Sequence, residues 1–179
     1  MHCKYSILLG VALMTYHILQ ITARVEFTNL KCVSLDKTFS DFEYCQIKAV
    51  NRSYKYFELK IQLFKVPVSN VTVNVALMKR LNGYKPFLYN VTFDACKFIK
   101  STNKNPVINY FYGFLSKHSN INHTCPFNND LLVDKVSIEF VNYQVVKVLP
   151  FPEGDYAVFT NWYAYDINRA DVRLYLTLA

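Results

Sequence analysis

The chain has 179 residues, 52% of them hydrophobic, with 14 Tyr and 14 Phe, which is enough to build one domain around a large apolar core. Its formal net charge is +7 at pH 7, but the lysines are scattered and no nucleic-acid recognition motif accompanies them, so we expect no nucleic-acid partner. The sequence also contains no phosphate-binding glycine loop, no Gly-x-Ser-x-Gly elbow and no metalloprotease helix. We therefore expect a protein that is not an enzyme and uses no cofactor.

The N-terminus has the pattern of a secretory signal peptide. Lys4 supplies a positive charge, an apolar run covers 5–21, and the small residue Ala23 marks the expected cleavage point. The alternative is an uncleaved signal anchor, because an apolar run of this length nearly spans a bilayer, but polar residues in its second half favour cleavage. We expect a signal peptide at 1–23 and a single secreted domain at 24–179, with no stable membrane insertion after cleavage.

Alternation of apolar and polar residues predicts a series of strands. They are expected at 25–33, 42–50, 54–64, 70–77, 86–96, 131–141, 144–149, 156–165 and 172–178. The alternation is clearest where Phe57, Leu59 and Ile61 face one side, and it is ragged in the two stretches between 131 and 149. Allowing for the two ragged stretches, seven or eight of these strands are expected to form, and their short turns, such as the one at Asn82-Gly83, predict an all-β protein. Its architecture is expected to be a two-sheet antiparallel β-sandwich.

One helix is expected to interrupt the strands, at about 106–118. Asn105 and Pro106 suit the N-cap and the first helical position. Apolar residues then recur at helical spacing: Val107, Tyr110, Phe111, Phe114 and Leu115. We expect this apolar helix to lie over a sheet, tethered by the cysteines that flank it in sequence.

Four cysteines remain once Cys3 leaves with the signal peptide, and in an exported protein they are expected to form two disulfides. The sequence alone allows three connectivities. We favour Cys32 with Cys45, which would join neighbouring strands, and Cys96 with Cys125, which would pin both ends of the helical segment.

N-glycosylation acceptor sequences occur four times, at Asn51, Asn70, Asn90 and Asn122. Two of them, at Asn70 and Asn90, fall on the polar faces of expected strands. The sequence therefore predicts a glycoprotein whose sugars leave the core face of the sheets free.

Residues suited to chemistry are few. His118 and His123 are the only histidines after the expected cleavage point, and His123 lies inside a glycosylation acceptor. A zinc site formed by these two with Cys96 and Cys125 is the alternative to a disulfide, but an oxidising compartment consumes the thiolates that zinc requires. We expect no metal site.

Five stretches, taken in order, resemble a known family. They are 27–32, 82–92, 94–98, 122–126 and 149–156. These motifs look like the large insect family of secreted proteins of unassigned function that includes the CheB-like chemosensory proteins. That family is in turn similar, more remotely, to the ML lipid-recognition group that includes the ganglioside activator protein. The resemblance implies a β-sandwich whose two sheets part to hold a lipid tail, with no shared catalytic residues.

These observations lead to two hypotheses about function. The first is a secreted glycoprotein that binds a hydrophobic ligand such as a lipid or hydrocarbon, with a role in chemosensation. Its expected ligand contacts are Phe57, Leu59, Ile61, Phe93, Phe111, Phe114, Phe159 and Trp162. The alternative is an extracellular interaction protein that binds a receptor or glycan through its basic face, with an ordinary filled core.

Overall fold

The computed structural model describes residues 24–51, 54–101 and 105–179. The expected signal peptide therefore lies outside the described residues. The strands are β1 (Val25–Ser34), β2 (Ser40–Ala49), β3 (Lys55–Leu63), β4 (Val71–Leu81), β5 (Gly83–Asp94), β6 (Leu131–Ser137), β7 (Gly154–Ala164) and β8 (Ile167–Leu178). The helices are α2 (Ala95–Lys100), α3 (Pro106–Gly113), α4 (Ile138–Tyr143) and the π-helical η1 (Gln144–Val148).

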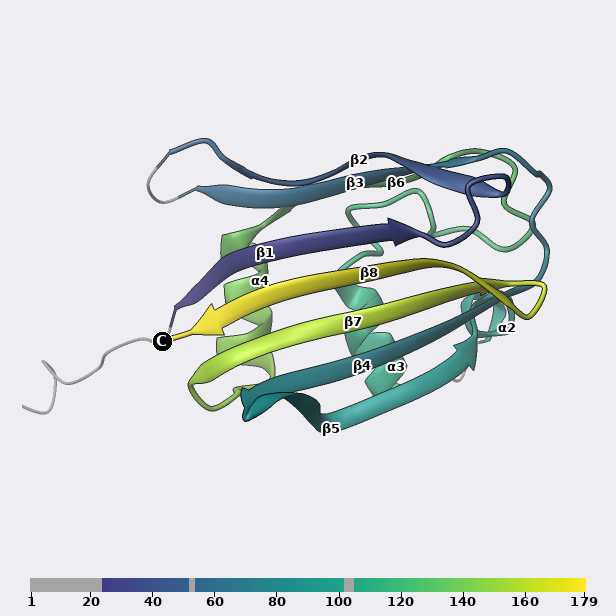
Figure 1. The fold of residues 1–179 in the computed structure, drawn as a ribbon. Coiled ribbons are helices and arrows are strands. Elements are labelled where there is room, and N and C mark those ends of the chain that lie inside the picture. The colour runs from purple at the N-terminus through teal and green to yellow at the C-terminus, as the bar shows by residue number, and fades with distance from the viewer. Residues whose placement is uncertain (1–23, 52–53, 102–104) are drawn as a thin grey trace, which may run out of the picture.

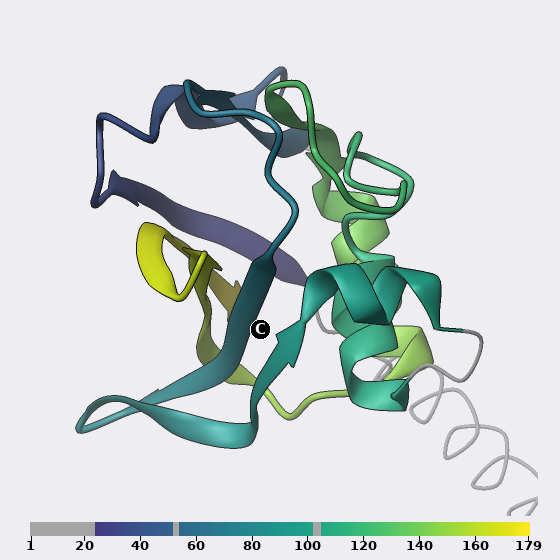
Figure 2. The ribbon, with the colours of Figure 1, turned by 90° about the vertical axis from the view of Figure 1, so that its right-hand side faces the viewer.

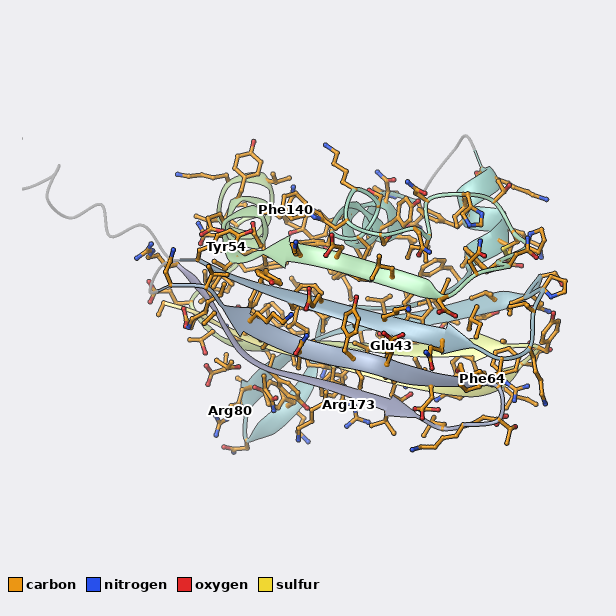
Figure 3. The ribbon with its side chains drawn as sticks, turned by 90° about the horizontal axis from the view of Figure 1, so that it is seen from above. Glu43, Tyr54, Phe64, Arg80, Phe140 and Arg173 are labelled. Atoms are coloured by element: carbon orange, nitrogen blue, oxygen red, sulfur yellow. A yellow bond between two sulfur atoms is a disulfide. The ribbon has the colours of Figure 1, made fainter. Side chains whose placement is uncertain are left out.

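The eight strands form two antiparallel sheets that face each other, which confirms the expected two-sheet β-sandwich (Figure 1). One sheet has five strands in the order β1-β8-β7-β4-β5, and the other has three in the order β2-β3-β6. Figure 3 looks onto the three-stranded sheet from above. Glu43 of β2, which is labelled in this view, forms an ion pair with Lys60 of β3, with 2.7 Å between the charged atoms.

The sandwich is fastened along one side and wedged open along the other. On the fastened side, β1 and β2 follow each other in the chain but lie in different sheets, and the Cys32–Cys45 disulfide joins them. The sequence predicted this pair but placed it between neighbouring strands, whereas it links the two sheets. On the other side, helices α2, α3 and α4 lie between the edge strands β5 and β6 (Figure 2).

Strand β3 alternates as expected but is buried on both faces. Tyr56 and Glu58 alternate with Phe57, Leu59 and Ile61 and so belong to the other face, yet they are only 8% and 6% exposed. The reason is that β3 lies between β2 and β6, whose side chains cover it; Lys48 of β2 approaches the Glu58 carboxylate to 2.7 Å. Burial raises the pKa of Glu58, but hydrogen bonds from Lys48 and Gln46 outweigh it and hold that pKa below its ordinary value.

The two ragged strands expected at 131–141 and 144–149 are largely wrong. Only the first part is a strand, β6, after which the chain forms α4 and η1. The Ser137 hydroxyl caps the helix by accepting a hydrogen bond from the Phe140 amide at 3.2 Å. Three buried residues recur at helical spacing: Ile138, Val141 and Val145. Their β-branched composition is typical of strands, and packing of this stripe against the core overrides that preference.

Helix α3 begins where the sequence predicted. The Asn105 side-chain oxygen accepts hydrogen bonds from the amides of Val107 at 3.0 Å and Ile108 at 3.3 Å, as an N-cap should. The helix ends at Gly113 and not near 118, and the chain continues in turns. The inserted segment also contains a helix that the sequence did not predict. This helix, α2, begins at Ala95, whereas the strand before it was predicted to continue to residue 96.

Helix α2 is started by Asp94, the last residue of β5. Its carboxylate accepts a hydrogen bond from the Lys97 amide at 2.8 Å, and this bond is the main reason that the pKa of Asp94 is lowered. The following Cys96 is joined to Cys125, which confirms the second predicted disulfide. The covalent loop therefore contains most of α2 and all of α3, and it fixes both ends of the segment that wedges the sheets apart.

Replacing Cys96 or Cys125 by Ser should lower secretion strongly. The bond closes a loop with a sequence separation of 29, and loop-closure entropy makes such a bond worth about 3 to 4 kcal/mol. The matched control is His123→Ala, an exposed neighbour whose loss leaves the acceptor at Asn122 intact. Secreted protein is measured by immunoblot of the medium. Equal secretion of the cysteine variants and the control would contradict a structural role for this bond.

Candidate functional site

A cavity of about 240 Å³ lies between the two sheets and the helices. Apolar residues from the inner faces of five strands form most of its wall. They include Phe57, Leu59, Ile61, Val71, Val73, Val75, Leu77, Val133, Val158, Trp162, Val172, Leu174 and Leu176. The wall is thus built by the alternating side chains of strands that the sequence showed most clearly.

The helical segments contribute residues to the cavity wall. They lie between β5 and β6 (Figure 2). Phe111 of α3 packs edge-on against Tyr89 of β5, with 6.1 Å between the ring centroids. Phe114, just after α3, packs against Tyr110 at 5.2 Å and against Phe140 of α4 at 6.2 Å. None of the residues of α3 is fully buried. This helix is therefore held by ring contacts at its margins and is not embedded in a filled core.

Seven of the eight expected ligand contacts lie in the cavity wall. They are Phe57, Leu59, Ile61, Phe93, Phe111, Phe114 and Trp162. These residues come from β3, β5, β7 and the helical segment, so the fold brings together residues far apart in the sequence.

The eighth residue, Phe159, was wrongly expected to face inward. It lies on the outer face of the five-stranded sheet, where its ring packs against Tyr84 at 6.2 Å and Tyr175 at 5.9 Å. The Arg173 guanidinium lies 5.0 Å from the centroid of the Phe159 ring. The physical reason is the two-residue repeat of a strand, because Phe159 and Trp162 are three positions apart and cannot share a face without a bulge between them.

Several wall residues were missed by the sequence reasoning. In β7 they are Tyr156, Val158 and Thr160, which share the parity of Trp162 and could have been found from it. From α4 and η1 they are Val141 and Val145, which were assigned to strands. The helical spacing of these two residues was the available signal.

Most polar groups in the wall are satisfied by the protein. The Tyr110 hydroxyl donates to the Gln144 carbonyl at 3.2 Å, and burial raises the pKa of Tyr110 to about 12. The Tyr156 hydroxyl donates to the Pro152 carbonyl at 2.6 Å. The Trp162 indole donates to the Thr160 hydroxyl at 2.9 Å. These groups serve the fold and leave the middle of the cavity with an apolar character.

Arg169 is the one charged residue in the cavity wall formed by the described residues. Its guanidinium forms an ion pair with Asp36 and lies 4.3 Å from the centroid of the Phe39 ring. The pKa of Asp36 is lowered, first by a hydrogen bond from the Thr38 hydroxyl and also by Arg169. The charge of Arg169 is therefore balanced where it meets the cavity.

The other sequence candidates lie away from the cavity. Cys96 and Cys125 are joined, which removes the thiolates that the alternative zinc site would need. His123 contacts the Phe127 ring at 5.2 Å, and no group of three metal-ligating side chains occurs within residues 24–51, 54–101 and 105–179. The four acceptor asparagines are exposed: Asn51, Asn70, Asn90 and Asn122. Ser53, which completes the first acceptor, is outside the described residues.

Comparison with known proteins shows similarity to a protein family and to solved structures. Residues 73–158, from β4 to β7, are similar to a family described as a protein of unknown function (DUF1091). Among solved structures, the chain is similar to a Niemann-Pick type C2 protein from Japanese carpenter ant, with 14% sequence identity over 87% of this chain and 92% of that chain. The TM-score is 0.30, too low to argue from, so the fold rests on the strand pairing described above. No match was found among curated proteins.

The chain contains one tryptophan, and Trp162 lines the cavity, so its fluorescence should report on an occupant. A brominated fatty acid should quench this fluorescence by contact and reach saturation. The Phe159→Ala variant, altered on the opposite face of the same strand, should give the same curve. Quenching that rises linearly without saturation would contradict a binding site beside Trp162.

Proposed function

We propose that this protein is a secreted glycoprotein that binds a hydrophobic small molecule or lipid between its two sheets. The observation that carries the proposal is the apolar cavity of about 240 Å³. At about 24 cal/mol per Å³, a void of this size costs about 6 kcal/mol of stability. A whole domain is stable by only about 5 to 15 kcal/mol, so an occupant that fills the void would offset a large share of that cost.

The rest of the chain supports secretion and a carrier role. Two disulfides are typical of proteins that fold in an oxidising compartment, and each acceptor asparagine is accessible to a glycosyltransferase. Within the described residues, no helix has the length and apolar character needed to cross a membrane. The resemblance of the sequence motifs to CheB-like proteins supports a role in chemosensation. The proposed role is binding without a catalytic step.

The helical segment should control affinity for the ligand. Phe111→Ala and Phe114→Ala should each weaken binding of a fluorescent fatty acid roughly fivefold to tenfold, because each removes about 1 kcal/mol of apolar contact. Phe159→Ala is the control, since it removes the same ring from the outer face. Probe binding and melting temperature are measured on the same samples.

Two outcomes would contradict the carrier proposal. In a filled core, each truncation would cost about 3 to 5 kcal/mol and the melting temperature would fall sharply. The parent protein would then bind no probe. The carrier proposal would also be contradicted if Phe159→Ala weakened probe binding as much as Phe111→Ala did.

A second candidate is an extracellular interaction protein, and one surface favours it. On the outer face of the five-stranded sheet, Tyr84, Phe159 and Tyr175 form an aromatic cluster, with Tyr84 and Tyr175 rings 5.3 Å apart. The Lys31 ammonium lies 6.0 Å from the Tyr175 ring, and Arg173 lies above Phe159. Loss of partner capture by Phe159→Ala, with probe binding unchanged, would support this second candidate.

A further inference from the structure

A polar corner lies at the end of the cavity where β1 turns into β2. Ser40 and Arg169 both line the cavity there. Ser40 is 2% exposed, and its strand partner is Leu63, which also lines the cavity. Because partners directly opposite each other in a sheet share a face, the Ser40 side chain is on the inner face.

The Ser40 hydroxyl has no hydrogen-bond partner among the described residues. The backbone of Ser40 is fully engaged, since its amide donates to the Asp36 carbonyl at 3.0 Å and its carbonyl accepts from the Ser34 hydroxyl at 2.6 Å. The Ser40 side chain is nearly buried and faces the cavity, where an unpaired hydroxyl gains a hydrogen bond from any suitable group that an occupant presents. An oxygen atom of a bound molecule would supply the missing partner.

Arg169 reaches the cavity because of a bulge in β8. Trp162 pairs with Ala170 and Tyr163 pairs with Asn168, so Arg169 is the extra residue between them. A bulge changes the direction in which a side chain points, and bulges are over-represented next to functional sites. In β8 the bulge places the Arg169 guanidinium over the buried Phe39 ring and beside the Asp36 carboxylate. The backbone carbonyl of Asp36 also accepts the hydrogen bond from the Ser40 amide.

We infer that Ser40 and Arg169 together bind one neutral oxygen at the end of the apolar ligand, as found in a long-chain alcohol, ester or ketone. This inference rests on the proposed function and names the ligand class. The middle of the wall is apolar, so a second polar group on the ligand would lie against apolar side chains. Because Asp36 already balances Arg169, a carboxylate ligand would bring a second negative charge beside Asp36.

The test compares ligands that share one chain length. Octanol, methyl octanoate, octane and octanoate each displace the apolar fluorophore N-phenyl-1-naphthylamine from the parent protein at pH 7. Octanol and methyl octanoate should bind about three- to tenfold more tightly than octane or octanoate, the gain expected from one neutral hydrogen bond. Ser40→Ala should erase this advantage and leave octane unchanged. The control Ser69→Ala removes an exposed hydroxyl that lies 3.4 Å from the Tyr165 hydroxyl, away from the cavity wall.

The outcomes separate this inference from the proposed function. Equal binding of octane and octanol, tighter binding of octanoate, or an unchanged ligand ranking in Ser40→Ala would each overturn the neutral-oxygen site while leaving the carrier proposal standing. Failure of the parent protein to bind the fluorophore or any of the four ligands would overturn both. Should Ser40→Ala fail to fold, Ser40→Cys keeps the shape of the side chain, with a slightly larger atom and a weaker donor, and it should still reduce the advantage of octanol over octane.

Discussion

The separation of the two sheets along one side is the constraint on which the cavity depends. The Cys32–Cys45 bond holds β1 against β2, so the sheets cannot part there. Along the opposite side, α2, α3 and α4 occupy the gap between β5 and β6, and the Cys96–Cys125 bond fixes the segment that carries α2 and α3. A sandwich fastened on one side and wedged on the other cannot bring its inner faces into full contact. The space that remains is the apolar cavity.

The inner and outer faces of the two sheets differ in polarity. Inside, aromatic and aliphatic side chains surround the cavity, and the Tyr110 and Tyr156 hydroxyls are turned to backbone carbonyls. Outside, charged pairs such as Lys60 with Glu43 cover the three-stranded sheet (Figure 3). Asn74 donates to Asn90 and Thr92 at 2.9 and 2.8 Å, which orders the strand face that carries one glycosylation acceptor. The glycosylation acceptor and the cavity therefore lie on opposite faces of the same sheet.

The sequence predicted what strict periodicity controls. Alternation along β3 and β4 determined the core faces, and the Asn105 cap with Pro106 located the start of α3. The prediction failed at α4 and η1, whose composition is typical of strands but whose buried residues recur at helical spacing. In that segment, packing against the core decided between strand and helix. Phe159 was wrongly expected in the core, because an aromatic ring suits a core position by composition but its parity relative to Trp162 places it on the other face. Neither the cavity nor the bulge that turns Arg169 inward follows from local pattern, because both arise from how distant strands meet.

The most direct measurement is native mass spectrometry of protein purified from the medium of insect cells and then enzymatically deglycosylated. If the protein encloses a hydrophobic ligand, the native mass should exceed the denatured mass by that of a small apolar molecule. An organic extract should contain that molecule, and a Trp162→Ala variant should hold less of it than a Phe159→Ala variant. Identical native and denatured masses, together with no uptake of added lipid or hydrocarbon, would contradict the account.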